Sequence, residues 1–540
     1  MKTFRLFTLI LLLNFITVKI QVSACTNYLV TKGASTDGST MITYSADAHV
    51  LYGELYYKPA AIYPPGTMLE IYEWDTYRYL GKIKQALRTY SVVGNMNEYQ
   101  VSVGETTFGG REELSNPKGR IDYGSLMYIA LQRAKNAREA IKVMTQLANE
   151  YDYCSHGESF SIADPNEVWI MEMIGKGVGN KGAVWIALRV PDGYVCAHAN
   201  QARIRQIILN DTMNCYYAKD LISFARDKGW FNGADKDFSF VDAYAKPDFG
   251  GLRFCEARVW SFFRKINAGM EKYRDYAMAE NPNNPMPLFI KPDKKLTLQD
   301  VISGMRDHFQ GTPMDMTKDI GAGPYKCPYR WRPLEWYGPD STKYFNERAV
   351  STQQTGFSFV AQSRSWLPAP IGGIIWFGVD DTYSTVYVPM YCGIRKVPAS
   401  YAVGNGSFQD FTWNSAFWVF NFVANYTYSR YSDMIQDVQI IQRELEGNFM
   451  AMVPEIDKYA VELYKTSPEN ARNYLTDYSC KSGDNTVSQW MKLGEFLIWK
   501  YLDGNVKDEY GKPHHPGYPN DWYKKIIDST GDQFKVKKLP

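Results

Sequence analysis

Short apolar runs separated by turn residues dominate the first 400 positions of the chain. The clearest case starts at Thr26, where apolar stretches at 27–30 and 40–44 flank a turn that contains Asp37 and Gly38. This pattern predicts a β-hairpin. Similar runs predict further strands at 51–57, 90–93, 99–103, 159–163, 168–173, 184–188, 195–199, 356–362, 373–379 and 385–389.

Apolar residues at helical spacing mark the other elements. Between 123 and 150 they recur at steps of three and four, which predicts one helix, and residues 205–310 are predicted to be mostly helical. Two amphipathic helices are expected at 434–452 and 489–501. The Gly-, Pro- and Lys-rich end, 503–540, is predicted to be irregular.

Strands, then helices, then strands again indicate a layered α+β architecture. The change in pattern near residue 400 predicts two parts after the leader: a domain at 25–400 and a helical region with an irregular tail at 401–540. The helical region could shape a cleft or form an interface between subunits, so a homo-oligomer is one possibility.

The first 24 residues have the pattern of a signal peptide. Lys2 and Arg5 precede a mostly apolar run at 7–18, and small residues end the segment at Ala24. We therefore expect cleavage just before Cys25 and export to the periplasm or the medium. The apolar run is too short to span a bilayer, and no later segment is long and apolar enough, so no membrane span is predicted.

Residues 22–25 also resemble the lipobox of bacterial lipoproteins. Under that alternative Cys25 would carry lipid, and the chain would be a surface-anchored binding protein rather than an enzyme. A lipidated sulfur cannot act as a nucleophile, so the two hypotheses exclude each other at this residue.

Composition excludes several other classes of protein. The chain has 540 residues, 45% hydrophobic and 22% charged, which is typical of a globular protein. Lysines and arginines are interspersed with carboxylates, and the formal net charge is only +2, so no nucleic-acid partner is expected. The eight cysteines and six histidines show no zinc-binding spacing, and HExxH is absent, so no metal or other cofactor is expected.

A cysteine at a mature N-terminus carries a thiol and a free α-amine on one residue. The amine has an ordinary pKa near 8, so a useful fraction is unprotonated near neutral pH and can accept the thiol proton. Groups that hold the amine and stabilise an oxyanion would complete such a site, and no histidine is needed.

Several short motifs occur in order between residues 25 and 395. They are Cys25-Thr26-Asn27-Tyr28-Leu29-Val30, Gly38-Ser39-Thr40-Met41-Ile42, Gly104-Glu105-Thr106-Thr107, Gly157-Glu158-Ser159-Phe160, Trp169-Ile170-Met171-Glu172, Ala199-Asn200-Gln201 and Gln362-Ser363-Arg364. Together they resemble the dipeptidases of peptidase family C69, which are related to secernins.

The resemblance implies an N-terminal nucleophile hydrolase with an αββα sandwich that hydrolyses dipeptides or short peptides. A more distant similarity to choloylglycine hydrolases and penicillin V acylases implies roles for single residues. Cys25 would be the nucleophile, Asp47 would hold the α-amine, and Asn200 would help to form the oxyanion hole. Arg258 matches an active-site arginine, and Thr107 falls where the acylases have a second polar group.

One position departs from the related families. Tyr44 stands where the acylases and many family members have arginine, and a phenol supplies no fixed positive charge for a thiolate. Either the amine does more of the work, or Arg258 compensates.

Each candidate also has a plain structural alternative. Asp47 could be a turn residue, Asn200 a strand-end cap, and Arg258 a surface or ion-pair residue. Glu172, flanked by apolar residues, is interpreted as a buried structural carboxylate and left out of the catalytic set. An amidase that cleaves N-acyl groups on the same fold is the alternative activity.

Overall fold

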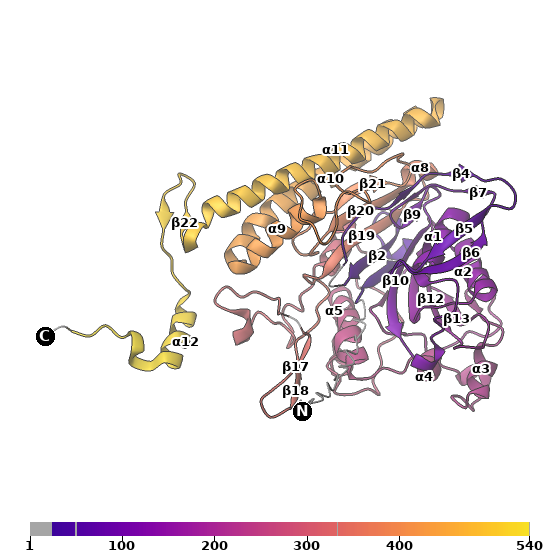
Figure 1. The fold of residues 1–540 in the computed structure, drawn as a ribbon, viewed down its shortest axis with the longest axis horizontal. Helices are drawn as coiled ribbons and strands as arrows, with labels where there is room; N and C mark the ends of the chain where they lie inside the picture. The colour runs from indigo at the N-terminus through magenta and orange to yellow at the C-terminus, as the bar shows by residue number, and fades with distance from the viewer. Residues whose placement is uncertain (1–23, 49–50, 332, 539–540) are drawn as a thin grey trace, which may run out of the picture.

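The computed structural model describes residues 24–48, 51–331 and 333–538, and its core is a pair of antiparallel β-sheets between layers of helices (Figure 1). The mixed α+β architecture predicted from the sequence is confirmed. The predicted signal peptide lies, apart from Ala24, outside the described residues.

The first sheet has seven strands in the order β16-β14-β1-β2-β19-β20-β21. Its strands are β1 (Asn27–Val30), β2 (Thr40–Asp47), β14 (Val195–His198), β16 (Phe289–Ile290), β19 (Thr355–Ser363), β20 (Gly373–Val379) and β21 (Val388–Tyr391). The predicted N-terminal hairpin is confirmed, with Leu29 opposite Ile42. On its other edge β2 pairs with β19, so residues 40–47 and 355–363, far apart in the sequence, are neighbours in one sheet.

The second sheet has eight strands in the order β15-β13-β12-β11-β10-β9-β8-β3. They are β3 (Tyr57–Lys58), β8 (Val92–Val93), β9 (Met96–Asn97), β10 (Ser102–Gly109), β11 (Gly157–Ala163), β12 (Val168–Gly175), β13 (Ala183–Arg189) and β15 (Cys215–Tyr217). The predicted strand at 51–57 is largely wrong, because regular pairing begins only at Tyr57. Two small two-stranded sheets lie beside this sheet: the hairpin of β5 (Met68–Tyr72) with β6 (Tyr79–Lys84), and the pair of β4 (Ala61–Ile62) with β7 (Arg88–Thr89), which encloses that hairpin in the sequence.

The two sheets pack face to face. β2 of the first sheet contacts β10 and β11 of the second. His198, at the end of β14, reaches across and bonds through its two ring nitrogens to Thr106 Oγ1 and Ser161 Oγ, each at 2.7 Å. These bonds tie the sheets together next to the start of β1, because His198 lies opposite Asn27.

Helices cover both outer faces. On the second sheet lie α1 (Tyr123–Arg133) and α2 (Ala137–Tyr151), whose apolar sides form a core with that sheet. The predicted single helix at 123–150 is therefore wrong. The chain breaks at 134–136, where the Asn136 side chain accepts a hydrogen bond from Glu139 N and starts α2 as its cap.

The first sheet is covered by α5 (Ala257–Ile266) and by C-terminal helices. Phe262 of α5 stacks on Tyr28 of β1 at 3.7 Å between ring centroids. The helical segment expected at 205–310 contains several short helices but also β15 and β16. The remaining helices and strands of the central region are α3 (Leu221–Asp227), α4 (Phe240–Tyr244), α6 (Arg274–Ala277), α7 (Leu298–Met305), β17 (Glu335–Tyr337), β18 (Lys343–Phe345) and α8 (Ala369–Gly372).

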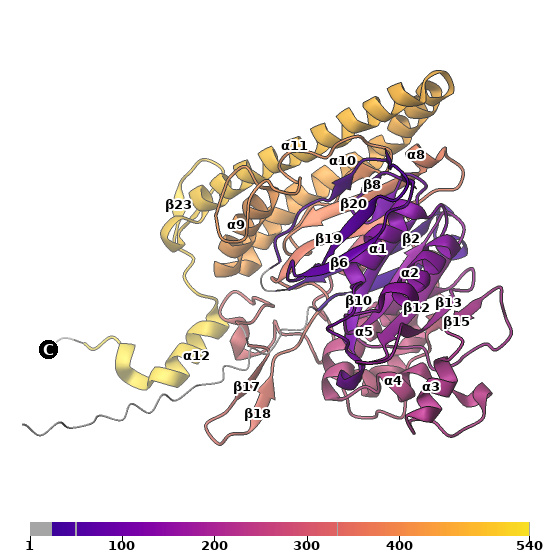
Figure 2. The same cartoon turned by 45° about the vertical axis from the view of Figure 1, so that its right-hand side comes forward.

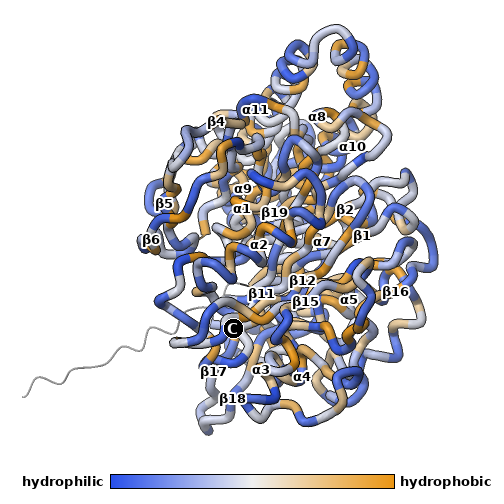
Figure 3. The backbone as a smooth tube through the Cα atoms, turned by 90° about the vertical axis from the view of Figure 1, so that its right-hand side faces the viewer, coloured by the Kyte–Doolittle hydropathy of each residue, from blue (hydrophilic) through white to orange (hydrophobic). Residues whose placement is uncertain are grey.

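The C-terminal helices are α9 (Ala416–Ser429), α10 (Tyr431–Thr466) and α11 (Pro468–Lys500), and α10 and α11 run side by side as a long hairpin (Figure 2). Both predicted amphipathic helices are confirmed, and both extend beyond the predicted bounds. Hydrophobic and hydrophilic positions alternate along the hairpin, whose tip projects beyond the sheets (Figure 3). Trp490 of α11 is fully buried and stacks on Phe420 of α9.

The last segment differs from the prediction of an irregular tail. It contains a small hairpin of β22 (Val506–Lys507) with β23 (Pro513–His514), and then α12 (Asn520–Thr530). None of the residues of α12 is buried, and the helix stands apart from the sheets (Figure 1). Among the described residues, none of the helices combines the length and the apolar character needed to cross a bilayer.

Candidate active site

Cys25 lies two residues before the start of β1, where the two sheets meet, and is completely buried. In the full chain its nitrogen is the peptide N–H that follows Ala24, and it donates to Asn200 Oδ1 at 2.7 Å. Both the thiol and the main-chain nitrogen of Cys25 are therefore shielded from solvent at the junction of the two sheets.

Asn200 is held in an unusual conformation two residues after β14. Its φ of 59° lies in the left-handed region, which asparagine adopts more readily than most residues. Its Oδ1 accepts from Cys25 N and from Arg258 Nη2 at 2.9 Å, while its Nδ2 donates to the main-chain oxygen of Thr107 at 2.8 Å. The side chain therefore presents an acceptor to Cys25, whereas the predicted oxyanion role requires a donor.

Arg258 lies in the first turn of α5, after a π-helical turn at Gly251–Glu256. Its Nη1 donates to the main-chain oxygen of Cys25 and, at 2.8 Å, to Thr26 Oγ1. Burial, with a smaller effect of Arg348, lowers the pKa of Arg258 to about 10, so the side chain stays charged at neutral pH. The arginine is buried in the site rather than on the surface, and these bonds fix the main chain of Cys25.

Asp47 ends β2 and forms a buried ion pair that has no local signal in the sequence. Its Oδ2 lies 2.6 Å from Arg348 Nη2, and its Oδ1 accepts from Thr355 Oγ1 at 2.7 Å. The same Arg348 nitrogen donates to the main-chain oxygen of Ala24 at 3.0 Å. Asp47 O in turn accepts from Ala24 N at 2.7 Å, so this pair holds the residue that precedes Cys25.

The thiol of Cys25 lies among groups that disfavour its ionised form. Its Sγ is 3.7 Å from Glu105 Oε1 and 4.0 Å from Tyr44 Oη. Burial, followed by the charges of Glu105 and Asp47, raises the pKa of Cys25 well above its usual value, although the main-chain N–H of Asp47 opposes this. A base near the sulfur is therefore needed to make a thiolate.

Gly104 of β10, in the facing sheet, lets the main chain of that strand pack closely against Tyr44 of β2. A Cβ on Gly104 would lie only 3.2 Å from Tyr44 Cβ, and Tyr44 Oη donates to Glu105 Oε1 at 2.5 Å. The phenol thus orients a carboxyl group beside the sulfur at the position where related families have arginine. Burial raises the pKa of Tyr44 well above its usual value, so the phenol remains a hydrogen-bond donor.

Glu105 and Glu158 form a buried carboxyl pair that the sequence motifs contained but did not single out. Glu158 Oε1 accepts from Thr107 Oγ1 at 2.9 Å, and the two carboxyl groups contact each other. Burial raises the pKa of Glu105 to about 7, and burial together with the charge of Glu105 raises that of Glu158 well above its usual value. Both shifts favour protonation of the pair, because two buried carboxylates repel each other.

Glu172, interpreted from the sequence as a structural carboxylate, lies away from these groups. It is fully buried on β12 and accepts hydrogen bonds from the main-chain N–H groups of Arg203 and Ile204. Burial raises its pKa to about 7. These bonds fix the segment that follows Asn200, so Glu172 supports the site without facing the thiol.

The buried His198 makes stability depend on pH. Burial, and secondarily Arg203, lowers its pKa from 6.5 to about 3. Because the folded pKa is depressed, the unfolded chain binds a proton first as the pH falls, so stability present above pH 6.5 is lost towards pH 3. We expect His198→Gln to reduce the pH dependence of the free energy of unfolding by roughly 1.4 kcal/mol per pH unit, measured in urea titrations between pH 6 and 4.

The exposed His514 provides the control, since its replacement by glutamine leaves the buried His198 and His308 in place. His308, whose pKa burial lowers to about 4, accounts for part of the slope that remains. Parallel slopes for the wild type and His198→Gln would contradict the assignment.

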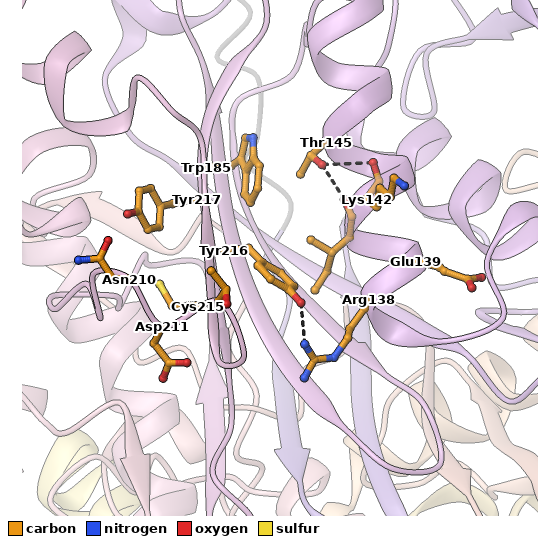
Figure 4. Close-up of a pocket in the computed structure, with 12 residues that line it drawn as sticks. Arg138, Glu139, Lys142, Thr145, Trp185, Asn210, Asp211, Cys215, Tyr216 and Tyr217 are labelled. Carbon is orange, nitrogen blue, oxygen red and sulfur yellow. Dashed lines mark hydrogen bonds between the residues drawn. The ribbon is translucent and has the colours of Figure 1, made fainter.

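A separate surface pocket of 580 Å³ lies between α2 and strands β13 and β15 (Figure 4). Figure 4 shows Arg138 and Lys142 of α2 on one side of it and Trp185 and Tyr216 on the other, with Arg138 bonded to the Tyr216 hydroxyl at 2.6 Å. None of the residues around Cys25 lines it.

Comparisons with known proteins identify the family that this chain resembles. The sequence pattern of the family described as Peptidase family C69 matches residues 24–444, so the match begins one residue before Cys25. A probable dipeptidase of Salmonella dublin is 25% identical over 69% of this chain and 82% of its own length. Probable dipeptidase B of Lactococcus lactis is 24% identical over 88% of this chain and 95% of its own length, and a dipeptidase of Bifidobacterium longum is 24% identical over 70% and 72%.

Proposed function

Because this chain belongs to peptidase family C69 and is a peptidase, we propose that it is an exported dipeptidase whose nucleophile is the Cys25 thiol. The α-amine that Cys25 gains when residues 1–24 are removed serves as its base. The proposal assigns the paired sheets and their helical covers to the N-terminal nucleophile hydrolase fold. It places the mature protein in the periplasm or outside the cell.

The observation that carries the proposal is the setting of the Cys25 nitrogen. It lies 2.7 Å from Asn200 Oδ1, and the carbonyl of the same residue is held by Arg258. After cleavage the same acceptor would bind the α-amine and point its lone pair towards the sulfur. The printed names of the relatives, dipeptidase or probable dipeptidase, supply the substrate class.

The reaction follows from these positions. The amine takes the proton from Sγ, and the sulfur attacks the carbonyl carbon of the scissile peptide bond. The C–N bond breaks, the leaving nitrogen takes the proton from the Cys25 ammonium, and a thioester remains on Sγ. Water then attacks the thioester while the amine accepts its proton. The C–S bond breaks, the acid leaves and the thiol is restored.

In this mechanism the buried groups of the site have separate tasks. Asn200 orients the amine through Oδ1, and Arg258 fixes the main chain of Cys25. The ion pair of Asp47 and Arg348 holds Ala24 before cleavage and borders the space that its removal leaves. Tyr44 supplies a hydrogen bond but no charge, so the amine, rather than a fixed cation, activates the sulfur.

The test compares two proteins that differ by one residue at the N-terminus, one beginning at Cys25 and one at Ala24. Hydrolysis of an alanyl dipeptide is expected from the first, and a loss of about 100-fold or more from the second, whose Cys25 nitrogen is an amide that cannot act as a base. Intact mass before and after the assay shows that neither protein has changed.

Equal activity of the two proteins would contradict an amine base. The exported protein should also have the mass of a chain that starts at an unmodified Cys25. Added lipid mass would favour the surface-anchored alternative, and cleavage of N-acyl amides with no action on dipeptides would favour the amidase.

A further inference from the structure

Glu105 on β10 and Glu158 on β11 lie on neighbouring strands beside the thiol, and each is only 1% exposed. Thr107 joins them, since it lies two residues after Glu105 and opposite Glu158 in the strand pairing. Glu105 Oε1 is already bonded to the Tyr44 hydroxyl and lies 3.7 Å from Cys25 Sγ. One end of the pair therefore touches the nucleophile.

The outer oxygens of this pair lack donors. Apart from the contact between the two carboxyl groups, no N–H or O–H group in the described part of the chain donates to Glu105 Oε2 or Glu158 Oε2. Neither glutamate forms an ion pair within that part. By contrast, the buried Asp47 faces Arg348 and the buried Glu256 faces Arg203 at 2.9 Å. A buried carboxylate with no partner cation is costly, so the fully ionised pair is favourable only when a cation from outside the described chain lies beside it.

A third carboxyl group adds to the negative charge. Asp75 lies in the exposed turn between β5 and β6, and its Oδ1 accepts from the Tyr123 hydroxyl at 2.8 Å. Its charge acts on both Glu105 and Glu158 and raises the pKa of each. The acidic groups thus extend from the thiol towards the surface at this turn.

We propose that Glu105 and Glu158 bind the protonated amino terminus of the peptide substrate. This inference rests on the proposed function of Cys25 and specifies which peptides that site accepts. An ammonium group offers three donors and one positive charge, and these match the two carboxyl oxygens without donors and the missing cation.

The spacing agrees with cleavage after the first residue. In a peptide the N-terminal nitrogen is two bonds, or about 2.5 Å, from the carbonyl carbon of the same residue. A sulfur poised to attack that carbon lies about 3 to 3.5 Å from it. An ammonium bound beside Glu105, which is 3.7 Å from Sγ, therefore places the first peptide bond at the nucleophile.

Loss of a proton from the carboxyl pair allows it to bind the positive charge of the substrate ammonium. Without substrate, the two carboxyl groups hold a proton between them. When the ammonium binds, the proton leaves to solvent and the ionised pair faces the cation. A peptide with an acylated amino terminus brings no charge and leaves the protonated pair unchanged, so it gains none of this binding energy.

The experiment compares Ala-Ala with N-acetyl-Ala-Ala on wild type and Glu158→Gln. Glutamine keeps the shape and the bond from Thr107 but removes the charge. We expect Glu158→Gln to lower kcat/KM for Ala-Ala on the order of 100-fold, because a hydrogen bond to a charged group is lost. For N-acetyl-Ala-Ala the change should stay within about threefold.

Asp380→Asn is the matched control, since this carboxyl group is also buried and its Oδ2 also receives no hydrogen bond within the described residues, but its Oδ1 accepts from Asn421 Nδ2 rather than from a group of the site. Both of its rates should remain within about threefold of wild type. Equal losses for both substrates in Glu158→Gln, or no loss for Ala-Ala, would overturn the proposal. Melting curves show whether each variant is folded.

The acylation of Cys25 by p-nitrophenyl acetate distinguishes a failure of the ammonium site from a failure of the proposed function of Cys25. The ester has no amino group, so the burst of nitrophenol reports only the thiol. A burst in wild type and Glu158→Gln, with equal use of Ala-Ala, would refute the ammonium site alone. Absence of both the burst and dipeptide hydrolysis in the wild type would refute the proposed function itself.

Discussion

Replacing Cys25 with alanine is expected to lower kcat/KM for dipeptides by about 10⁴-fold or more, because loss of a covalent nucleophile removes the acylation step itself. Alanine keeps the α-amine at the new N-terminus, so the variant separates the thiol from the base. The fold should survive, since the main-chain bonds to Asn200 and Arg258 do not involve the sulfur. Hydrolysis of Ala-Ala at pH 7, with intact mass to confirm the N-terminus, measures the effect.

Cys480 offers the matched control. It is a partly exposed cysteine on α11, and its sulfur contacts only the main-chain oxygen of Lys396 at 3.9 Å among the bonds described. Cys480→Ala should keep wild-type activity. Appreciable hydrolysis by Cys25→Ala, in protein free of a contaminating peptidase, would show that another residue performs the chemistry.

The strands that build the site could be predicted because their patterns are local. The hairpin of β1 and β2 follows from two apolar runs around Asp37-Gly38, and β11 to β14 follow from short apolar runs with turns between them. The break between α1 and α2 could not be predicted by periodicity, since both helices continue one apolar pattern. Its signal is Asn136, a capping residue inside that pattern.

The prediction of an irregular tail at 503–540 was wrong because the elements of the tail have no apolar pattern. The Gly and Pro residues of the tail indicate turns. However, β22, β23 and α12 bury little apolar surface, so no periodic pattern of hydrophobic residues predicts them. The short hairpins at 61–89 are similar, because most of their residues are at least partly exposed.

For the candidate site, local sequence patterns predict single residues but not the partners that hold them. Cys25, Asp47, Asn200 and Arg258 were all predicted, and the structure brings them to one place. Their partners were not. Arg348 is 301 residues from Asp47 in the sequence, and no spacing rule links residues so far apart. The polar bonds that orient a side chain, such as those of Asn200, depend on the folded sheets rather than on neighbours in the chain.

Glu105 and Glu158 each belong to one of the sequence motifs, but the sequence does not predict that the two side chains lie together. Each is surrounded by strand residues, and a single glutamate in a strand is usually solvated on one side. Only the pairing of β10 with β11 and the burial of both side chains reveal two carboxyl groups beside a thiol. Tyr44 differs from the residue found in the related families, and only the folded structure shows that it donates a hydrogen bond to Glu105.

The tyrosine and the glutamate together change the electrostatics expected of a cysteine nucleophile. An arginine beside the sulfur would lower the pKa of the thiol, whereas Glu105 and Asp47 raise that of Cys25. Such a thiol has little thiolate at rest and is protected from adventitious oxidation or alkylation. Under the proposed function, its reactivity would then depend on the α-amine that removal of residues 1–24 creates.

Replacing Arg348 with methionine is expected to destabilise the protein by about 3 to 5 kcal/mol, because it leaves Asp47 as a buried charge without its cation. Arg348 and Asp47 are 3% and 0% exposed in their side chains, so water cannot replace the lost contact. Urea unfolding followed by tryptophan fluorescence measures the change. The bonds to Thr355 and Ser45 remain, but hydroxyl donors do not neutralise a carboxylate.

Asp47→Asn combined with Arg348→Met gives the decisive comparison. The double variant should be more stable than the sum of the single losses predicts, by about 1 to 3 kcal/mol, because it contains no unpaired charge. Lys465→Met breaks a surface pair with Glu462, in which both side chains are 63% exposed, and should cost less than about 1 kcal/mol. Additive losses in the double variant would show that the pair does not act as a unit, and that Asp47 is held beside Cys25 by its hydroxyl partners instead.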